Sequence, residues 1–307
     1  MNWDQEITAA AARIAPYIRR TPVVELRDIG LDYPVLAKLE QMQHTGSFKA
    51  RGAFNTLLSL PVPVAGVVAA SGGNHGAAVA FAAQRLGHPA HIFVPEFAGP
   101  AKIALIRSTG ANLTVLPGAY ANALTAAQAY EAETGAMQIH AYDAAPTLAG
   151  QGTVLAEWEE QGLDADTILI AVGGGGLIGG ALAWLAGRRK VVAVEPRLAP
   201  TLHAALETGP ETLVDVSGVA ANALGARKIG QLCYGLAKAQ NVQSVLVEDE
   251  AITAAQHLLW YKSRQLVEPA GATALAALTS GAYRPAAGEK VAVLVCGANI
   301  APDPFAA

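Results

Sequence analysis

The sequence is poor in charge, in aromatic residues and in cysteine. Of its 307 residues, 15% are charged and 6% are aromatic, and its two cysteines are Cys233 and Cys296. Two cysteines so far apart suggest neither a disulfide framework nor a CxxC metal site, and they favour a reducing compartment. The lysines and arginines form no long run, so the pattern that binds a phosphate backbone is missing. We therefore expect no nucleic-acid partner.

The sequence also lacks the features of a leader peptide or a membrane span. Residues 1–6 are acidic, whereas a secretory signal begins with basic residues, so we expect a cytoplasmic protein. Residues 168–187 are uncharged over a spanning length. This stretch contains four consecutive glycines, and each glycine lowers helix stability by roughly 1 kcal/mol relative to alanine. We therefore expect a strand, a glycine loop and a helix there, and no membrane partner.

Apolar segments are abundant, at 52% hydrophobic residues, and strand-like runs alternate with helix-like runs. Such alternation predicts βαβ units and a mostly parallel sheet. The predicted strands include residues 35–39, 64–70, 90–94, 113–116, 137–141, 167–172, 191–194 and 291–295, and the predicted helices include 49–58, 77–86, 101–108, 121–133, 148–159 and 177–186. From this pattern alone, the chain is one doubly wound α/β domain.

Four short segments hold the residues that suggest chemistry. In residues 43–52, Lys49 lies in a Gly/Ser turn directly before an apolar helical run, where a lysine can be a nucleophile. The other three segments are Ser71-Gly72-Gly73-Asn74-His75-Gly76, the tetraglycine Gly173-Gly174-Gly175-Gly176 followed by Leu177, and Cys296-Gly297-Ala298-Asn299. Each of these three follows a predicted buried strand, and glycine-rich turns at strand C-termini are where open α/β sheets bind ligands.

The glycine loop by itself allows a second interpretation. Gly174-x-Gly176-x-x-Gly179 follows a strand and opens a helix, and Glu195 lies 21 residues after Gly174. This is the spacing of a dinucleotide-binding fingerprint, so the loop alone favours NAD. The lysine turn lies early in the chain and the tetraglycine lies late, and this order argues against the NAD interpretation. A nucleotide-binding protein therefore stays as the remote alternative.

Taken together and in this order, the four segments resemble the pyridoxal-phosphate (PLP) enzymes of fold type II, in the threonine/serine dehydratase and serine racemase family. The resemblance extends from residues 14–17 to residues 296–299. It implies a tryptophan-synthase-β-like α/β fold with two parallel-sheet-based domains and the cofactor in the cleft between them. Residues 1–51 and 141–307 would form the large PLP-binding domain and residues 52–140 the small substrate-gripping domain. Family habit also implies a homodimer.

The resemblance assigns roles to individual residues. Lys49 matches the lysine that holds PLP as a Schiff base and then takes the substrate's Cα proton, and desolvation and the following helix would lower its pKa. Asn74 matches the contact to the phenolic oxygen of PLP, and Cys296 lies where a neutral serine or cysteine faces the pyridine nitrogen. The expected cofactor-binding residues are Phe48, Lys49, Asn74, Gly173, Gly174, Gly175, Gly176, Leu177 and Cys296. The expected substrate-binding residues are Ser71, Gly72, Gly73, Asn74 and His75.

Two of these assignments have plainer alternatives. Ser47 aligns with a family serine near the cofactor, but it is equally suited to be the N-cap of the helix that follows. His75 is expected to be a structural histidine or a backbone contributor rather than an acid or base. Cys233 is expected to be a small core residue.

Three positions depart from the family pattern. Gly72 stands where the racemases carry a second acid/base serine, so efficient racemisation is not expected. Glu195 and Ala199 match two ligands of the family's divalent-cation site, but Thr201 replaces an aspartate, which makes the cation doubtful. Asn222 replaces the aspartate of the commoner Ala-Asp-Gly pattern, so it is a candidate contact to a substrate unlike plain serine or threonine.

The resemblance therefore predicts a small amino-acid substrate and a PLP-dependent ammonia-lyase. The expected reaction is the β-elimination of water from L-threonine or L-serine, which gives a 2-keto acid and ammonia. The alternatives within the family are a serine or aspartate racemase and a 3-hydroxyaspartate dehydratase. A PLP- or nucleotide-binding protein without turnover is a further alternative.

Overall fold

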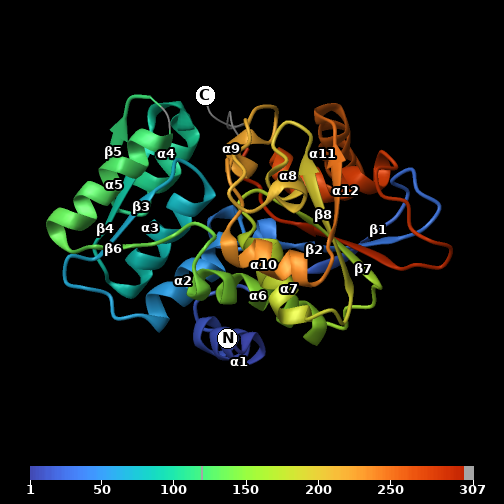
Figure 1. Cartoon of the computed structure of the whole chain (residues 1–307), viewed down its shortest axis with the longest axis horizontal. Helices are drawn as coiled ribbons and strands as arrows, with labels where there is room; N and C mark the ends of the chain where they lie inside the picture. The colour runs from blue at the N-terminus through green and yellow to red at the C-terminus, as the bar shows by residue number, and fades with distance from the viewer. Residues whose placement is uncertain (119, 301–307) are drawn as a thin grey trace.

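Two β-sheets organise the chain, which the computed structural model describes over residues 1–118 and 120–300 (Figure 1). The larger sheet has six strands in the order β1-β2-β10-β7-β8-β9. Its strands are β1 (Val23–Leu26), β2 (Val35–Leu39), β7 (Thr167–Ala171), β8 (Lys190–Pro196), β9 (Gln243–Val247) and β10 (Val291–Val295). Strand β1 is antiparallel to β2, and the other pairs are parallel. Both ends of the chain therefore contribute to one sheet.

The smaller sheet has four parallel strands in the order β5-β4-β3-β6. They are β3 (Val67–Ala70), β4 (Ala90–Pro95), β5 (Asn112–Leu116) and β6 (Met137–Gln138). All four lie inside residues 52–140, the segment predicted as the small domain, although the domain boundaries themselves stay a prediction. The two sheets are separate, which the strand pattern alone did not predict, since it indicated one doubly wound domain.

Helices cover the faces of both sheets. The α-helices are α1 (Trp3–Ile14), α2 (Lys49–Ser59), α3 (Asn74–Leu86), α4 (Pro100–Arg107), α5 (Tyr120–Thr134), α6 (Ala145–Glu160), α7 (Gly176–Leu185), α8 (Thr201–Thr208), α9 (Ala221–Leu224), α10 (Gln231–Ala239), α11 (Asp249–Ser263) and α12 (Pro269–Thr279). Short 3-10 turns are η1 (Glu40–Met42), η2 (His44–Gly46) and η3 (Glu96–Ala98). Helix α2 packs against both α3 and α6, so it connects the two halves of the structure (Figure 1).

The central strands are buried on both faces, as expected for a parallel sheet covered by helices. Every residue of β7 and of β10 is buried. The uncharged stretch 168–187 divides into β7, the glycine loop and α7, as predicted. Within the described ranges, the structure contains no helix that combines the length and the apolar character needed to cross a membrane.

Two predicted boundaries are wrong near residues Ser71–His75, the segment expected to bind substrate and called the substrate loop below. Strand β3 begins at Val67 rather than Val64, because Val64 is 99% exposed and Gly66 N donates to Pro63 O in a turn. Helix α3 begins at Asn74 rather than at residue 77. Asn74 therefore lies on the first turn of a helix, where backbone N–H groups have no intrahelical partner.

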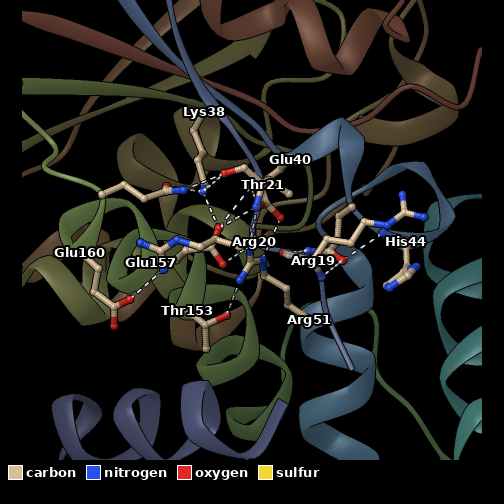
Figure 2. A network of polar contacts seen from close by, with 12 residues as sticks. Arg19, Arg20, Thr21, Lys38, Glu40, His44, Arg51, Thr153, Glu157 and Glu160 are labelled. Carbon is tan, nitrogen blue, oxygen red and sulfur yellow. Dashed lines mark hydrogen bonds and ion pairs between the residues drawn. The ribbon is translucent and has the colours of Figure 1, made fainter. Parts of the chain in front are cut away.

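A buried ion network fixes the start of α2 (Figure 2). Arg51 Nη2 lies 2.7 Å from Glu40 Oε1 in η1 and 2.9 Å from Glu157 Oε2 in α6. Lys38 Nζ of β2 completes the network, 2.5 Å from Glu157 Oε1. Buried charges are costly unless they are paired, and here two cations face two carboxylates. The network ties α2, two residues after Lys49, to both the large sheet and α6.

Candidate active site

The lysine turn and the C-terminal loop are joined by backbone hydrogen bonds. Phe48 N donates to Cys296 O at 3.2 Å, and Ala298 N donates to Gly46 O at 2.9 Å. Gly46 has a φ of 73°, and a Cβ there would lie 2.6 Å from Oδ1 of Asn299. The turn therefore requires glycine at this position. Two segments from opposite ends of the chain are thus held side by side.

Lys49 is the first residue of α2, and its Nζ donates to the Ala141 carbonyl oxygen at 2.7 Å. Burial lowers the pKa of Lys49 to about 8, and the nearby Cys296 acts weakly in the opposite direction. A substantial fraction of the amine is therefore neutral near physiological pH, which a nucleophile or base needs.

Phe48, not Ser47, occupies the N-cap position of α2, so the N-cap interpretation of Ser47 is wrong. Ser47 takes up an extended conformation and pairs with Gly297 in an isolated bridge. Its hydroxyl is buried and finds no hydrogen-bond partner among the described residues.

The amide of Asn74 is fixed at both ends. Its Nδ2 donates to Glu268 Oε1 at 2.6 Å, and its Oδ1 accepts from Asn299 Nδ2 at 2.8 Å. Asn299 Nδ2 also donates to Thr45 O at 2.7 Å. These hydrogen bonds set the orientation of the Asn74 amide. They leave the second N–H of its Nδ2 for another acceptor.

Glu268 is a site residue that the sequence analysis missed. It is 2% exposed and directly precedes Pro269, the first residue of α12. Burial raises the pKa of Glu268 to about 7, against the opposing effects of Lys102 and Asn74. The sequence does show a glutamate directly before a proline that can start a helix. It does not show the contact of this glutamate with Asn74, because the two residues are 194 positions apart.

The glycine loop follows β7 and leads into α7. A Cβ on Gly174 would overlap the ring of Tyr142, and a Cβ on Gly175, whose φ is 91°, would lie 2.5 Å from Cys233 Sγ. The loop is therefore enclosed by side chains that leave room only for glycine. Because α7 begins at Gly176, the N–H groups of its first turn face outward and favour an anion such as phosphate. The sequence analysis did not identify Tyr142 as a neighbour of the loop. It predicted Cys233 to be a small core residue, and Cys233 is buried.

The Ser71–His75 loop is closely packed. Ser71 Oγ accepts from Gly73 N at 3.2 Å, and a Cβ on Gly72 would overlap the Cβ of Ala98. His75 Nε2 donates to Ile139 O at 2.9 Å, with that tautomer assigned from the carbonyl partner. Burial, above all, lowers the pKa of His75 to about 3, so the ring is neutral. This histidine is held by the fold, in agreement with its structural interpretation.

One cavity collects all of the predicted cofactor residues. Its lining contains all nine of them, namely Phe48, Lys49, Asn74, Gly173, Gly174, Gly175, Gly176, Leu177 and Cys296. Tyr142, Ala171, Ala223, Leu224, Glu268 and Ala270 also line it. Of the predicted substrate residues, Asn74 lines this cavity, whereas Ser71, Gly72, Gly73 and His75 lie outside its lining. Cys296 Sγ donates to Ala270 O at 3.3 Å, and burial raises the pKa of the thiol, which keeps it neutral.

The residues around Glu195 do not fit a divalent cation. The two carboxylate oxygens of Glu195 accept hydrogen bonds from Thr201 Oγ1, Leu202 N, His203 N and Ser244 Oγ. The Ala199 carbonyl accepts from Thr201 N at 3.2 Å. Thus N–H and O–H donors occupy the acceptors that a cation would need. Glu195 is fully buried and its carboxylate oxygens are used by these donors, so it is not free to bind a ribose as a dinucleotide fingerprint would require.

Comparison with known proteins identifies the class. A family model described as "Pyridoxal-phosphate dependent enzyme" matches residues 14–297, and the chain belongs to this family. Phenylserine dehydratase of Ralstonia pickettii is 37% identical, over 98% of this chain and 94% of that protein. L-threonine ammonia-lyase of Geobacter sulfurreducens is 35% identical, over 96% of this chain and 75% of that protein. The structure of maize serine racemase superposes with a TM-score of 0.92 at 32% identity, covering 97% of this chain and 94% of that one.

The protein is therefore a PLP-dependent enzyme of the ammonia-lyase type, with the fold of the fold type II enzymes. The residues present fit the cofactor. Lys49 supplies a partly neutral amine, and the glycine loop forms a cradle that any Cβ would fill.

Proposed function

We propose that this chain removes water from a β-hydroxy amino acid, with L-threonine or L-serine as the leading substrate. The products are a 2-keto acid and ammonia. Among its relatives, L-threonine ammonia-lyase of Thermotoga maritima is 35% identical over 87% of this chain. The observation that carries the proposal is Lys49, a lysine of lowered pKa in a cavity whose lining also contains Asn74 and Cys296.

In this proposal, Lys49 would hold PLP, the first turn of α7 and the glycine loop would hold its phosphate, and Asn74 and Cys296 would contact its phenolic oxygen and ring nitrogen. The cofactor would supply electron withdrawal from Cα, which makes the Cα proton of the substrate acidic. Lys49 Nζ, with its pKa near 8, accepts that proton. The neutral thiol of Cys296 does not hold the ring nitrogen protonated, which suits elimination better than transamination.

The balance of the reaction needs no further reactant. The Cα–H bond and the Cβ–O bond break, the hydroxyl leaves as water, and the resulting enamine takes up water to release ammonia. The keto acid and ammonia together contain the atoms of the starting amino acid.

Gly72 supports elimination over racemisation. A racemase needs a group on the opposite face of Cα that returns a proton, and in the family that group is a serine. Gly72 has no side chain, and Ala98 occupies the space that a Cβ would need. Lys49 is thus the one proposed base, which acts on a single face.

A 3-hydroxyaspartate dehydratase is the second candidate. L-threo-3-hydroxyaspartate ammonia-lyase of Pseudomonas sp is 31% identical over 98% of this chain. Asn222, which departs from the family pattern, is in α9, directly before Ala223 and Leu224 of the cavity lining. This proximity favours a substrate that differs from serine in its side chain.

The test is the visible spectrum of the purified protein, followed by a substrate panel. L-threonine, L-serine, 3-hydroxyaspartate and 3-phenylserine would be added in turn while keto acid, ammonia and D-amino acid are measured. Keto acid from L-threonine or L-serine, with loss of both the cofactor band and turnover in Lys49→Ala, is the expected result. A D-amino acid that forms faster than keto acid would contradict the proposal.

We also propose the two-domain division at residues 52–140, and a homodimer, on the family resemblance. The proposed reaction does not depend on either the domain division or the homodimer. Sedimentation would measure the mass in solution, and a monomer would overturn the dimer without affecting the chemistry.

A further inference from the structure

Lys102 is a buried lysine beside the substrate loop, outside every role assigned above. It lies on α4, on the side of the four-stranded sheet, and it is 5% exposed. Among the described residues, its ammonium donates one hydrogen bond, a long one of 3.4 Å to the Asn222 carbonyl oxygen. A lysine ammonium has three donors, so the buried group is poorly satisfied. A buried cation in this condition is costly unless something pairs with it.

Three neighbours locate the ammonium at the edge of the cavity. A Cβ built on Gly73 would lie 3.9 Å from Lys102 Nζ and 3.5 Å from Asn222 O. Gly73 adjoins Asn74, and Asn222 adjoins Ala223, and both of these neighbours line the cavity. Glu268, also in the lining, interacts with Lys102 electrostatically. Lys102 is not itself part of the lining, but its ammonium lies next to lining residues, where the Ser71–His75 loop and α9 approach each other.

An anion at this place would also face the start of α3. The N–H groups of the first turn of α3, which begins at Asn74, have no intrahelical acceptor and attract negative charge. Burial lowers the pKa of Lys102, and Glu268 offsets this in part. A bound carboxylate would satisfy both the lysine and the helix terminus. Among the described residues, the Glu268 carboxylate accepts its hydrogen bond from Asn74 and none from Lys102.

We propose that Lys102 binds a carboxylate of the amino-acid substrate, by a charge-assisted hydrogen bond from its ammonium. This inference rests on the proposed function only in that the cavity binds an amino acid. The carboxylate is either the α-carboxylate that every substrate carries or the second carboxylate of a dicarboxylic substrate. The first source makes Lys102 a general binding residue, and the second makes it a specificity-determining one.

The experiment measures binding without turnover. PLP-loaded wild type and Lys102→Met would be titrated with L-alanine, which has one carboxylate, and with L-aspartate, which has two, and the change in visible absorbance would be followed. Neither amino acid has a β-hydroxyl to lose, so binding is read even if the enzyme is not a lyase. Lys102→Arg retains the charge, and Lys262→Met removes an exposed lysine as the matched control.

Loss of a charge-assisted hydrogen bond is expected to weaken binding by about tenfold or more. An equal loss for both amino acids assigns Lys102 to the α-carboxylate, and a loss confined to L-aspartate assigns it to the side chain. In either case Lys102→Arg should recover part of the affinity and Lys262→Met should match wild type. Affinities of Lys102→Met within about twofold of wild type for both amino acids would overturn the proposal.

A separate outcome tests whether Lys102 only balances the charge of Glu268. In that case Lys102→Met would change the pH dependence of the cofactor spectrum and leave both amino-acid affinities unchanged, which would also overturn the proposal. If Lys102→Met does not fold, Lys102→Gln, which retains a polar side chain of similar reach, gives the same comparison.

Discussion

The Asn74 amide donates to the Glu268 carboxylate across 2.6 Å, although the two residues are 194 positions apart. Glu268 thereby orients the side chain that is proposed to face the phenolic oxygen of PLP. The bond joins the start of α3, beside the small sheet, to the start of α12, beside the large one. The Glu268 carboxylate thus holds the starts of α3 and α12 together and orients Asn74. Its protonation state is therefore expected to affect both.

The protonation of Glu268 should be visible in stability. Burial raises its pKa from 4.5 to about 7. Between these values the folded protein retains a proton that the unfolded chain has lost, so the free energy of unfolding falls as the pH rises. The expected loss between pH 4.5 and pH 7 is about 3 kcal/mol. Urea unfolding of PLP-free wild type and Glu268→Gln across this range should show a stability difference that changes with pH. A constant difference would contradict the prediction.

Capture of PLP should depend on the neutral amine of Lys49. With a pKa of about 8, roughly a tenth of the amine is neutral at pH 7. The rate at which PLP-free protein develops its visible band should therefore rise with pH up to about 8 and then level off. Stopped-flow absorbance would measure this rate, with Lys49→Ala as the control that forms no band. A rate that continues to rise to pH 10 would indicate an ordinary, exposed lysine.

Sequence patterns located β10 and the glycine loop because these depend on local order. An unbroken apolar run predicts a buried strand, and residues 291–295 are indeed β10. The contacts of Glu268 and Tyr142 depend on the three-dimensional path of the chain, which no local pattern contains. The start of α3 was misplaced because Asn74-His75-Gly76 has the composition of a turn, and here the fold overrides that composition.

Tyr142 packs against the glycine loop, so a glycine-to-alanine substitution in the loop can be compared with the same substitution at an open position. Gly174→Ala would place a methyl group in the Tyr142 ring, so we expect a loss of about 1–3 kcal/mol in stability and a weaker affinity for PLP. Gly235→Ala lies in α10 with open space around the added Cβ, and it should stabilise the helix by up to about 1 kcal/mol. Thermal unfolding and PLP titration would compare the two. Equal effects would show that the loop tolerates side chains.

The buried network of Arg51 should matter far more than an exposed ion pair nearby. Arg51→Met leaves Glu40 and Glu157 without their shared cation, and removal of one partner of a buried pair costs about 3–5 kcal/mol. Arg20 pairs with Glu160 at the surface, where Arg20→Met should change stability little (Figure 2). Urea unfolding of the two variants is the measurement. Similar losses for both would mean that Lys38 alone neutralises the buried carboxylates.

The close packing around Gly72 limits the effect of replacing it with the serine that the racemases carry. A serine at this position needs space that Ala98 fills, and Val94 Cγ1 would lie 3.1 Å from the new Cβ. Gly72→Ser alone should lower stability by about 1–3 kcal/mol and still give keto acid faster than D-amino acid. The double variant Gly72→Ser/Ala98→Gly should recover stability and increase D-amino acid formation, because position 72 then carries the serine that the racemases of the family use as a second acid/base.

Chiral chromatography of the amino-acid pool, run beside the keto-acid assay, measures this outcome for wild type, both single variants and the double variant. Ala98→Gly alone is the control, since it creates the space without a proton donor and should therefore form no additional D-amino acid. If Gly72→Ser by itself racemised as fast as it eliminated, the substrate loop would have to move to accommodate the serine. The single-base interpretation of Lys49 would then depend only on the missing side chain of Gly72, and not on the packing of Ala98 against it.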